Sequence, residues 1–210
     1  GAGSIKAWIT ILGVSVIITL VLANAMGLAQ TKAKRMLAYS SVSHAGYLGL
    51  IFFGANSLSV YNLAFYLFAY SLATVGVFMT LIWVEKLKRE TSFEAFKGLA
   101  KSEPLLAVVT AVSLLSMAGI PLTAGFVAKF NIFAQAMNGA AFLVLIAVIG
   151  SALSIAYYLK LIISMFFHTE TTFKSSEKVS ITYNIIAVFI IVAILAIGIY
   201  PDLFKVQFGL

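Results

Sequence analysis

The chain has 210 residues, of which 62% are hydrophobic and only 10% are charged, whereas a soluble domain carries about 25% charged residues. This composition excludes a soluble globular domain and predicts an integral membrane protein made of α-helices. The chain contains no cysteine, which excludes disulfides, thiolate metal sites and iron–sulfur ligation by its own residues. The net charge of +7 lies in loops between apolar segments, which is typical of membrane topology and not of nucleic-acid binding.

Six hydrophobic segments are long enough to cross a bilayer, which takes about 20 apolar residues in a helix. They are residues 7–29, 36–53, 60–84, 104–137, 141–167 and 181–200. The fourth is too long for one straight crossing, and its glycines and proline predict a break near residues 119–125. An ordinary proline kink is the alternative. The predicted fold is therefore all-α, a single transmembrane domain over residues 1–210 with six crossings, one of them a broken helix.

The charged loops predict an orientation. If the six segments alternate in direction, ten basic residues fall on one side of the membrane: Lys32, Lys34, Arg35, Lys86, Lys88, Arg89, Lys97, Lys101, Lys174 and Lys178. The other side receives Lys6, Lys205 and two uncharged turns, residues 54–59 and 138–140. The positive-inside rule makes the basic side cytoplasmic, so both chain ends are expected on the opposite side.

The second segment begins with a polar face. Lys34, Ser41 and His44 lie close to one side of a helix, and Ser40 is one turn before His44. Histidine titrates near neutral pH and hydroxyls hold water or relay protons, so one interpretation is a proton relay. The other is that the serines bond their own helix carbonyls while His44 packs as a satisfied buried group.

The third segment carries a further polar face. Its members are Tyr61, Asn62, Tyr66, Tyr70, Ser71 and Thr74. Tyr66 and Tyr70 are one helical turn apart, so both could face His44 and Lys129. An aromatic contact between helices, with the hydroxyls bonded to neighbours, is the favoured interpretation of this face.

Lys129 is the only charged residue between Glu103 and Lys160. An ammonium at the centre of a membrane helix costs about 2.5–3.5 kcal/mol on insertion scales, so an intramembrane lysine predicts a functional site. Snorkelling is disfavoured because the turn at Asn138 is about 13 Å away along a helix. For Lys160, which is nearer a segment end, snorkelling and a functional role stay equally open.

The predicted break lies just before Lys129. Gly119, Pro121 and Gly125 should hold the segment open, which would free backbone carbonyls and bring the Thr123 hydroxyl within reach of Lys129 or its waters. No acidic residue lies in any of the six segments. If the Lys129 ammonium has an acidic partner, another part of the protein or a neighbouring subunit must supply it.

Two segments resemble motifs of a known family. Residues 30–47, QTKAKRMLAYSSVSHAGY, resemble a KR-LAYSS-SH-GY signature, and residues 116–130, SMAGIPLTAGFVAKF, resemble a broken helix with a key lysine. Both are motifs of the antiporter-like membrane subunits of bacterial NADH:quinone oxidoreductase, respiratory complex I. These subunits come in L-, M- and N-types. The resemblance implies a Glu at the position of Lys129 in the M-type and an extra C-terminal lateral helix in the L-type, and this sequence shows neither. The N-type subunit is therefore favoured. Ala128 stands where many relatives have Gly.

The resemblance implies the second half of an inverted-repeat transporter-like fold, and so part of a longer subunit. It implies proton translocation driven by quinone reduction elsewhere, with Lys129 as the output lysine and Lys34 and His44 on the path. It implies no cofactor and no covalent chemistry in this chain; NADH, FMN, Fe–S clusters and quinone would belong to other subunits.

The implied partners are the lipid bilayer and other membrane subunits of the complex, both antiporter-like neighbours and small subunits, in the bacterial inner (plasma) membrane. Both chain ends would then be periplasmic. Two other functions stay open. One is the homologous subunit of a multisubunit cation/proton antiporter or membrane-bound hydrogenase. The other is a structural scaffold without an ion path.

Overall fold

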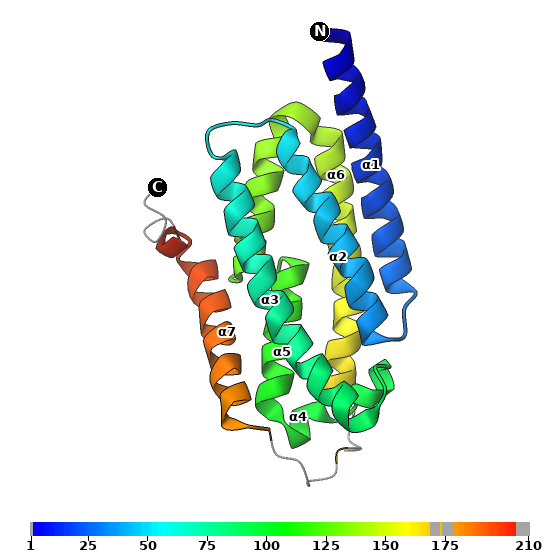
Figure 1. The fold of residues 1–210 in the computed structure, drawn as a ribbon, viewed down its shortest axis with the longest axis vertical. Helices are drawn as coiled ribbons and strands as arrows, with labels where there is room; N and C mark the ends of the chain where they lie inside the picture. The colour runs from blue at the N-terminus through cyan, green and yellow to red at the C-terminus, as the bar shows by residue number, and fades with distance from the viewer. Residues whose placement is uncertain (1, 169–172, 174–178, 205–210) are drawn as a thin grey trace.

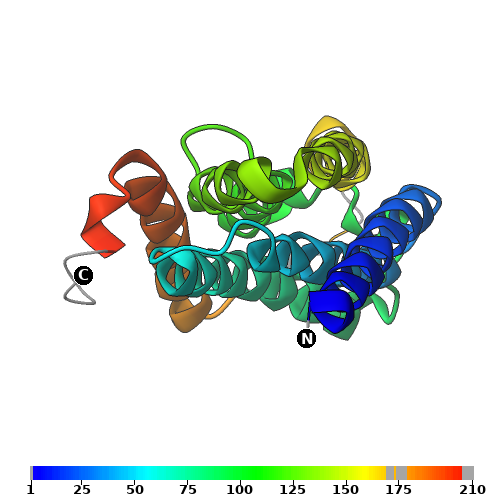
Figure 2. The ribbon, with the colours of Figure 1, turned by 90° about the horizontal axis from the view of Figure 1, so that it is seen from above.

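Seven α-helices and two short 3-10 helices make up the computed structural model, which describes residues 2–168, 173 and 179–204. In chain order they are α1 (Ala2–Leu28), α2 (Ala33–Gly49), η1 (Leu50–Phe52), α3 (Ser59–Lys88), η2 (Phe93–Phe96), α4 (Leu99–Ser102), α5 (Pro104–Ala118), α6 (Ala124–Phe167) and α7 (Ile181–Ile199). The long helices run roughly parallel or antiparallel to one another (Figure 1). Seen from above, α1 and α7 lie at opposite edges of the bundle (Figure 2).

Four of these helices are long and apolar enough to cross a membrane by themselves. They are α1 from Ile5 onward, α3, α6 and α7. The outer surface is apolar, with Trp8 and Ile181 71% and 76% exposed, whereas Asn24, His44 and Lys129 are buried inside. Apolar side chains outside and polar ones inside are the arrangement that lipid as a solvent requires.

The second predicted segment, residues 36–53, differs from the observed α2. The helix begins earlier, at Ala33, whose backbone N–H donates to the carbonyl of Thr91 at 2.7 Å. Its α-helical part ends at Gly49 and is followed by η1. Gly54 then reverses the chain with φ +73°, and a Cβ there would lie 2.3 Å from the carbonyl oxygen of Gln135, so only glycine fits this turn.

The 44 residues of α6 form two antiparallel arms and not one rod. Ala140 has φ −157° and ψ 54°, which are not helical values. Lys129 and Ser151, 22 positions apart, are hydrogen-bonded at 2.8 Å, whereas a straight helix would separate them by about 33 Å. Figure 1 shows the reversal at one end of the bundle. The non-helical Ala140 lies within residues 138–140, where the sequence predicts a turn before a new segment from residue 141.

The chain is non-helical between α5 and α6, over residues 119–123, inside the range where the sequence predicts a break. Gly119 has φ +84°, and its N–H bonds back to the carbonyls of Leu115 and Ser116, which ends α5. Leu122 also has positive φ, +73°. Gly125 already belongs to α6, where its N–H donates to the Ser116 hydroxyl at 3.0 Å. The break is therefore five residues long and lies near the middle of the bundle (Figure 1).

Two loops rich in basic residues meet at one end of the bundle. The N–H of Phe93 donates to the carbonyl of Thr31 at 3.0 Å, and Lys32 forms an isolated β-bridge with Ser92. The loop after α1 and the loop after α3 are thus joined by backbone hydrogen bonds. The predicted basic positions Lys174, Lys178 and Lys205 lie outside the described residues.

Candidate functional site

Lys129 lies on the first arm of α6, just after the break, and is only 4% exposed. Its ammonium donates to the carbonyl of Ala118 at 3.1 Å and to the Ser151 hydroxyl at 2.8 Å. The Ser151 hydroxyl itself donates to the Ala118 carbonyl at 3.0 Å. Ala118 is the last residue of α5, where unpaired carbonyls and the helix dipole favour a positive charge. The break thus supplies a backbone ligand for the ammonium.

Glycines shape the contact between the break and Lys129. A Cβ on Gly119 would lie 3.0 Å from the Lys129 side chain, so the missing side chain lets the lysine pass across the end of α5. A Cβ on Gly125 would lie 1.8 Å from the carbonyl oxygen of Ser116, a distance that no real Cβ tolerates. The Thr123 hydroxyl, expected within reach of Lys129 or its waters, donates to the Ile120 carbonyl at 2.7 Å and stabilises the loop itself.

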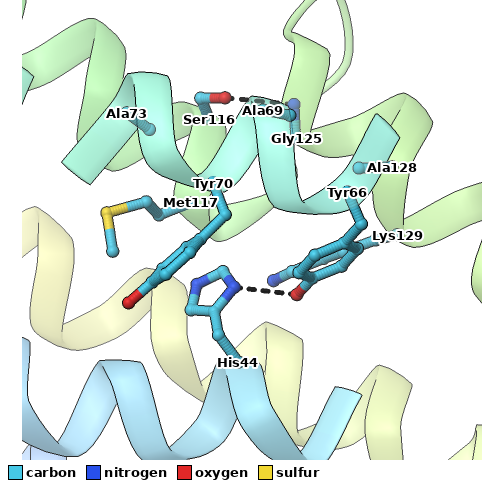
Figure 3. A pocket seen from close by; sticks show the side chains of 10 residues that line it. All are labelled: His44, Tyr66, Ala69, Tyr70, Ala73, Ser116, Met117, Gly125, Ala128 and Lys129. Carbon is cyan, nitrogen blue, oxygen red and sulfur yellow. Dashed lines mark hydrogen bonds between the residues drawn. The ribbon is translucent and has the colours of Figure 1, made fainter. Parts of the chain in front are cut away.

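His44 faces Lys129 across a small central cavity. Its Nδ1 is 2.7 Å from the hydroxyl of Tyr66, and its ring centroid is 4.5 Å from that of Tyr70 (Figure 3). The cavity is lined by His44, Tyr66, Ala69, Tyr70, Ala73, Ser116, Met117, Gly125, Ala128 and Lys129. Its volume of about 10 Å³ is close to the minimum for one water molecule. One water therefore bridges this space at most.

A second, larger cavity lies between α2 and α3, toward the basic end of the bundle. It measures about 350 Å³, and Lys34, Ser41, Tyr70 and Met117 are among the residues that line it. Tyr70 and Met117 also line the central cavity, so these two side chains separate the two spaces. The predicted residues Lys34, Ser41, Tyr70, His44 and Lys129 therefore line two adjoining cavities.

Lys34 does not contact His44 but forms an ion pair with Glu85. Its ammonium is 2.9 and 3.2 Å from the two carboxylate oxygens. Both side chains are partly exposed, so the pair contributes little stability but places a carboxylate beside the larger cavity. Lys160, which the sequence left open, donates to the carbonyl of Leu28 at 2.7 Å and thereby caps the end of α1, away from the central cavity.

A third cavity, about 410 Å³, lies near the other end of the bundle. Tyr61, Asn62, Asn131 and Phe130 are among the residues that line it. The Asn62 amide donates to Gln135 Oε1 at 2.9 Å, and Gln135 Nε2 donates to the carbonyl of Ile51 at 2.9 Å. These two buried amides tie α3, the first arm of α6 and η1 together beside this cavity.

Three buried polar side chains of the interior had no role in the sequence interpretation: Asn24, Tyr157 and Tyr158. Asn24 accepts a hydrogen bond from the Tyr157 hydroxyl at 3.2 Å and donates to the Tyr47 hydroxyl at 3.4 Å. Ser40 is hydrogen-bonded to the hydroxyl of Tyr158. Asn24 is the only Asn or Gln within residues 7–29. A lone amide in an apolar segment is the sequence feature from which a role for Asn24 in the interior could have been predicted.

Among the residues that the structure describes, Lys129 is the one Lys, Arg, Asp or Glu whose side chain is buried. The acidic residues within the described part are Glu85, Glu90, Glu94, Glu103 and Asp202, all in loops or at helix ends. Burial raises the pKa of Glu103, and a hydrogen bond from the backbone of Val179 acts in the opposite direction. Across the described residues, no group of three or more His, Cys, Asp or Glu side chains is placed to hold a metal ion.

The fold and the buried lysine beside a helix break define an antiporter-like membrane subunit. Residues 2–154 match the family model described as NADH:quinone oxidoreductase/Mrp antiporter, TM, which is well over half of the chain. The chain belongs to this family. The resemblance inferred from the two sequence motifs is thereby confirmed.

Two relatives of this chain carry the name of the same subunit within this family. NADH-quinone oxidoreductase subunit N of Cytophaga hutchinsonii is 38% identical over 92% of this chain and 42% of its own length. The protein of the same name from Flavobacterium psychrophilum is 36% identical over 89% of this chain and 40% of its own length. A chain of respiratory complex I from Thermus thermophilus with bound aureothin superposes with TM-score 0.80 at 35% identity, covering 92% of this chain and 44% of that chain. This chain thus spans about two fifths of the length of these relatives.

Proposed function

We propose that this chain is part of a proton-translocating N-type subunit of an NADH:quinone oxidoreductase. The observation that carries the proposal is Lys129, a buried ammonium held by the freed carbonyl at a helix break and facing His44 across a cavity. The similarity to proteins named NADH-quinone oxidoreductase subunit N supports the identity of the complex. Quinone reduction elsewhere in the complex would drive proton transfer here.

In this proposal protons enter from the basic end of the bundle. The cavity beside Lys34 and Ser41, about 350 Å³, has room for water and extends to Tyr70. Tyr70 and Met117 separate it from the central cavity, where His44 receives the proton with Tyr66 hydrogen-bonded to its ring. His44 passes the proton to the Lys129 amine directly or through one water. Lys160, the other candidate for the path, donates to the Leu28 carbonyl at the end of α1 and does not line either of these two cavities.

Release takes place toward the opposite end. The third cavity lies on that side, and the hydrogen bond between Asn62 and Gln135 stands beside it. Neutral amides of this kind bind water but do not titrate, so they let a proton pass only through water. A conformational or electrostatic change driven from outside the chain would open this exit after Lys129 is charged.

We further propose six membrane crossings in one half of an inverted-repeat fold. The crossings are α1, α2 with η1, α3, α5 with the first arm of α6, the second arm of α6, and α7. Alternating directions along the bundle support this count (Figure 1). The basic loops would be cytoplasmic and both chain ends periplasmic, in a bacterial inner membrane.

The chain itself is proposed to bind no cofactor and to catalyse no covalent reaction. NADH, FMN, Fe–S clusters and quinone would bind to other subunits of the complex. Its partners would be lipid and other membrane subunits, both antiporter-like neighbours and small ones. The exposed apolar side chains of α1 and α7, among them Trp8 and Phe189, offer surfaces for both.

A second candidate follows from the family description, which also covers the Mrp antiporters. In an Mrp antiporter, the same lysine path would exchange protons for another cation. In a membrane-bound hydrogenase, the path would be coupled to another redox module. Purification of the native complex separates these functions. Flavin and Fe–S subunits that purify with this chain support the first function, and their absence supports an antiporter.

The test is Lys129→Ala in the native complex. We expect an assembled complex that has lost most proton pumping, measured with a pH-gradient dye in membrane vesicles during NADH oxidation by quinone. Lys6→Ala, which removes an exposed ammonium at the end of α1, is the matched control and should pump like the parent. Normal pumping by an assembled Lys129→Ala complex would reject the proposed function.

A further inference from the structure

The Lys129 ammonium is held without any carboxylate from the described part of the chain. Its two hydrogen-bond acceptors are the Ala118 carbonyl and the Ser151 hydroxyl. A buried ammonium loses its hydration, and two neutral acceptors replace only part of it. A further favourable interaction is therefore needed if Lys129 is to carry a charge during turnover.

The ring of Tyr47 provides that interaction. Lys129 Nζ lies over the face of this ring, 4.6 Å from its centroid. A cation within about 6 Å of a ring centroid is attracted by the negative face of the aromatic ring, and the attraction grows when water is excluded. Tyr47 is only 1% exposed, so the contact is desolvated. We infer that the face of the Tyr47 ring is the ligand that stabilises the charged form of Lys129, in the place where a carboxylate would otherwise stand.

Two other helices fix the orientation of this ring. The Asn24 amide on α1 donates to the Tyr47 hydroxyl at 3.4 Å and also bonds the Leu20 carbonyl at 2.8 Å. A Cβ on Gly150, in the second arm of α6, would lie 3.3 Å from the same hydroxyl. The tip of Tyr47 is thus held between α1 and α6 while its face meets Lys129. Asn24 is a positioning residue that acts through Tyr47.

A neutral ligand suits a lysine that must give up its proton. A carboxylate would hold the ammonium through a strong Coulomb attraction in a medium of low dielectric constant. The ring, the carbonyl and the hydroxyl attract the ammonium more weakly and lose less when the amine becomes neutral. The proton leaves Lys129 Nζ for water or for His44, and no bond to Tyr47 forms or breaks. This inference rests on the proposed proton transfer through Lys129.

The test is a graded change in the ring at position 47 of the native complex. Tyr47→Phe removes the hydroxyl and keeps the ring, and fluorinated phenylalanines then withdraw charge from its face with little change in size. We expect pumping to fall stepwise from Phe through mono-, di- and trifluorophenylalanine, to about one tenth at the end of the series. Tyr47→Leu, which has no ring, should pump less than Tyr47→Phe. A packing role alone gives no such gradient.

The controls separate this inference from the proposed function. Tyr200→Leu removes an exposed tyrosine at the end of α7 and should leave pumping unchanged. If Lys129→Ala abolishes pumping but the fluorinated series is flat, the role of the Tyr47 ring is rejected and the proposed function stands. If Lys129→Ala pumps normally, the proposed function falls, and the inference falls with it. If Tyr47→Leu does not assemble, the nearly isosteric fluorinated series decides.

Discussion

Lys129 and Ser151 are joined by a hydrogen bond of 2.8 Å although they lie on opposite arms of α6. Both also bond the carbonyl of Ala118, the last residue of α5. The break after α5 and the reversal at Ala140 therefore converge on one point inside the bundle. The lysine, on the first arm of α6, is bonded to two further helical segments, α5 and the second arm, so its position depends on backbone geometry on both sides of the break.

The break should be intolerant of a side chain at Gly125. A Cβ there would lie 1.8 Å from the Ser116 carbonyl oxygen, so Gly125→Ala must displace the start of α6 from the end of α5. Overpacking of this kind costs about 1–3 kcal/mol. We expect Gly125→Ala to lower the amount of assembled complex or its apparent Tm, and to reduce pumping per complex.

Gly13→Ala is the matched exchange for this experiment. Its Cβ would make ordinary contacts of 3.6 Å or more, and alanine favours helix over glycine by about 0.5–1 kcal/mol. The stability of the Gly13→Ala complex should therefore equal or exceed that of the parent. Equal stability and pumping of the two variants would contradict the tight contact at Gly125.

His44 is expected to contribute to pumping without being indispensable. Its Nδ1 bonds the Tyr66 hydroxyl at 2.7 Å, and the cavity beside it has space for about one water. His44→Leu should lower pumping by about tenfold, less than the 10²–10⁴ that a single acid–base group can contribute, because water can bypass it. His44→Lys keeps a titratable group and should retain more pumping than His44→Leu. Normal pumping by His44→Leu would make His44 a packing residue.

The sequence predicted the features that local chemistry determines. A lysine without charged neighbours, followed along the chain by a long apolar stretch, predicts an intramembrane site at Lys129. Gly119 and Pro121 predict the end of a helix, because one adopts positive φ and the other lacks an N–H. The Lys34, Ser41 and His44 face follows from helical periodicity.

The partners of these residues could not be predicted in the same way. Ser151 and Asn24 meet Lys129 and Tyr47 only because α6 folds back and α1 packs beside α2, and these are relationships between distant segments. Lys34 was aligned with His44 by periodicity alone, whereas Glu85, 51 residues further on, captures its ammonium. The Thr123 hydroxyl was expected within reach of Lys129 or its waters, and its observed acceptor, the nearby carbonyl of Ile120, was not predicted.

Lys129→Arg should impair pumping although it keeps the charge. A guanidinium does not release its proton at any accessible pH, and its planar donors do not match the two acceptors of a lysine ammonium. We expect pumping close to that of Lys129→Ala, whereas Lys6→Arg at the exposed end of α1 should have no effect. Proton uptake by vesicles during quinone-dependent NADH oxidation measures both. Pumping by Lys129→Arg at the rate of the parent would mean that Lys129 acts as a fixed charge and not as a proton carrier.

Glu103, at the start of α5, predicts a pH dependence of stability. Burial raises the pKa of its carboxyl group in the folded chain, although the Val179 backbone donates a hydrogen bond to it. The folded state therefore binds this proton more tightly than the unfolded state. Its contribution to stability is present below the unfolded pKa and is lost as the pH rises through the raised folded value. At neutral pH the partly buried carboxylate should destabilise the fold.

Glu103→Gln tests this dependence, because the amide oxygen still accepts the bond from Val179 but carries no charge at any pH. At pH 7 we expect an apparent Tm of the purified complex higher by roughly 1 °C, since partial exposure screens the effect. The difference should vanish near pH 4, where Glu103 is protonated in the parent. Glu90→Gln, at an exposed position in the loop after α3, should show no such change. A Glu103→Gln difference that is the same at both pH values would mean that the substitution acts through packing at the start of α5.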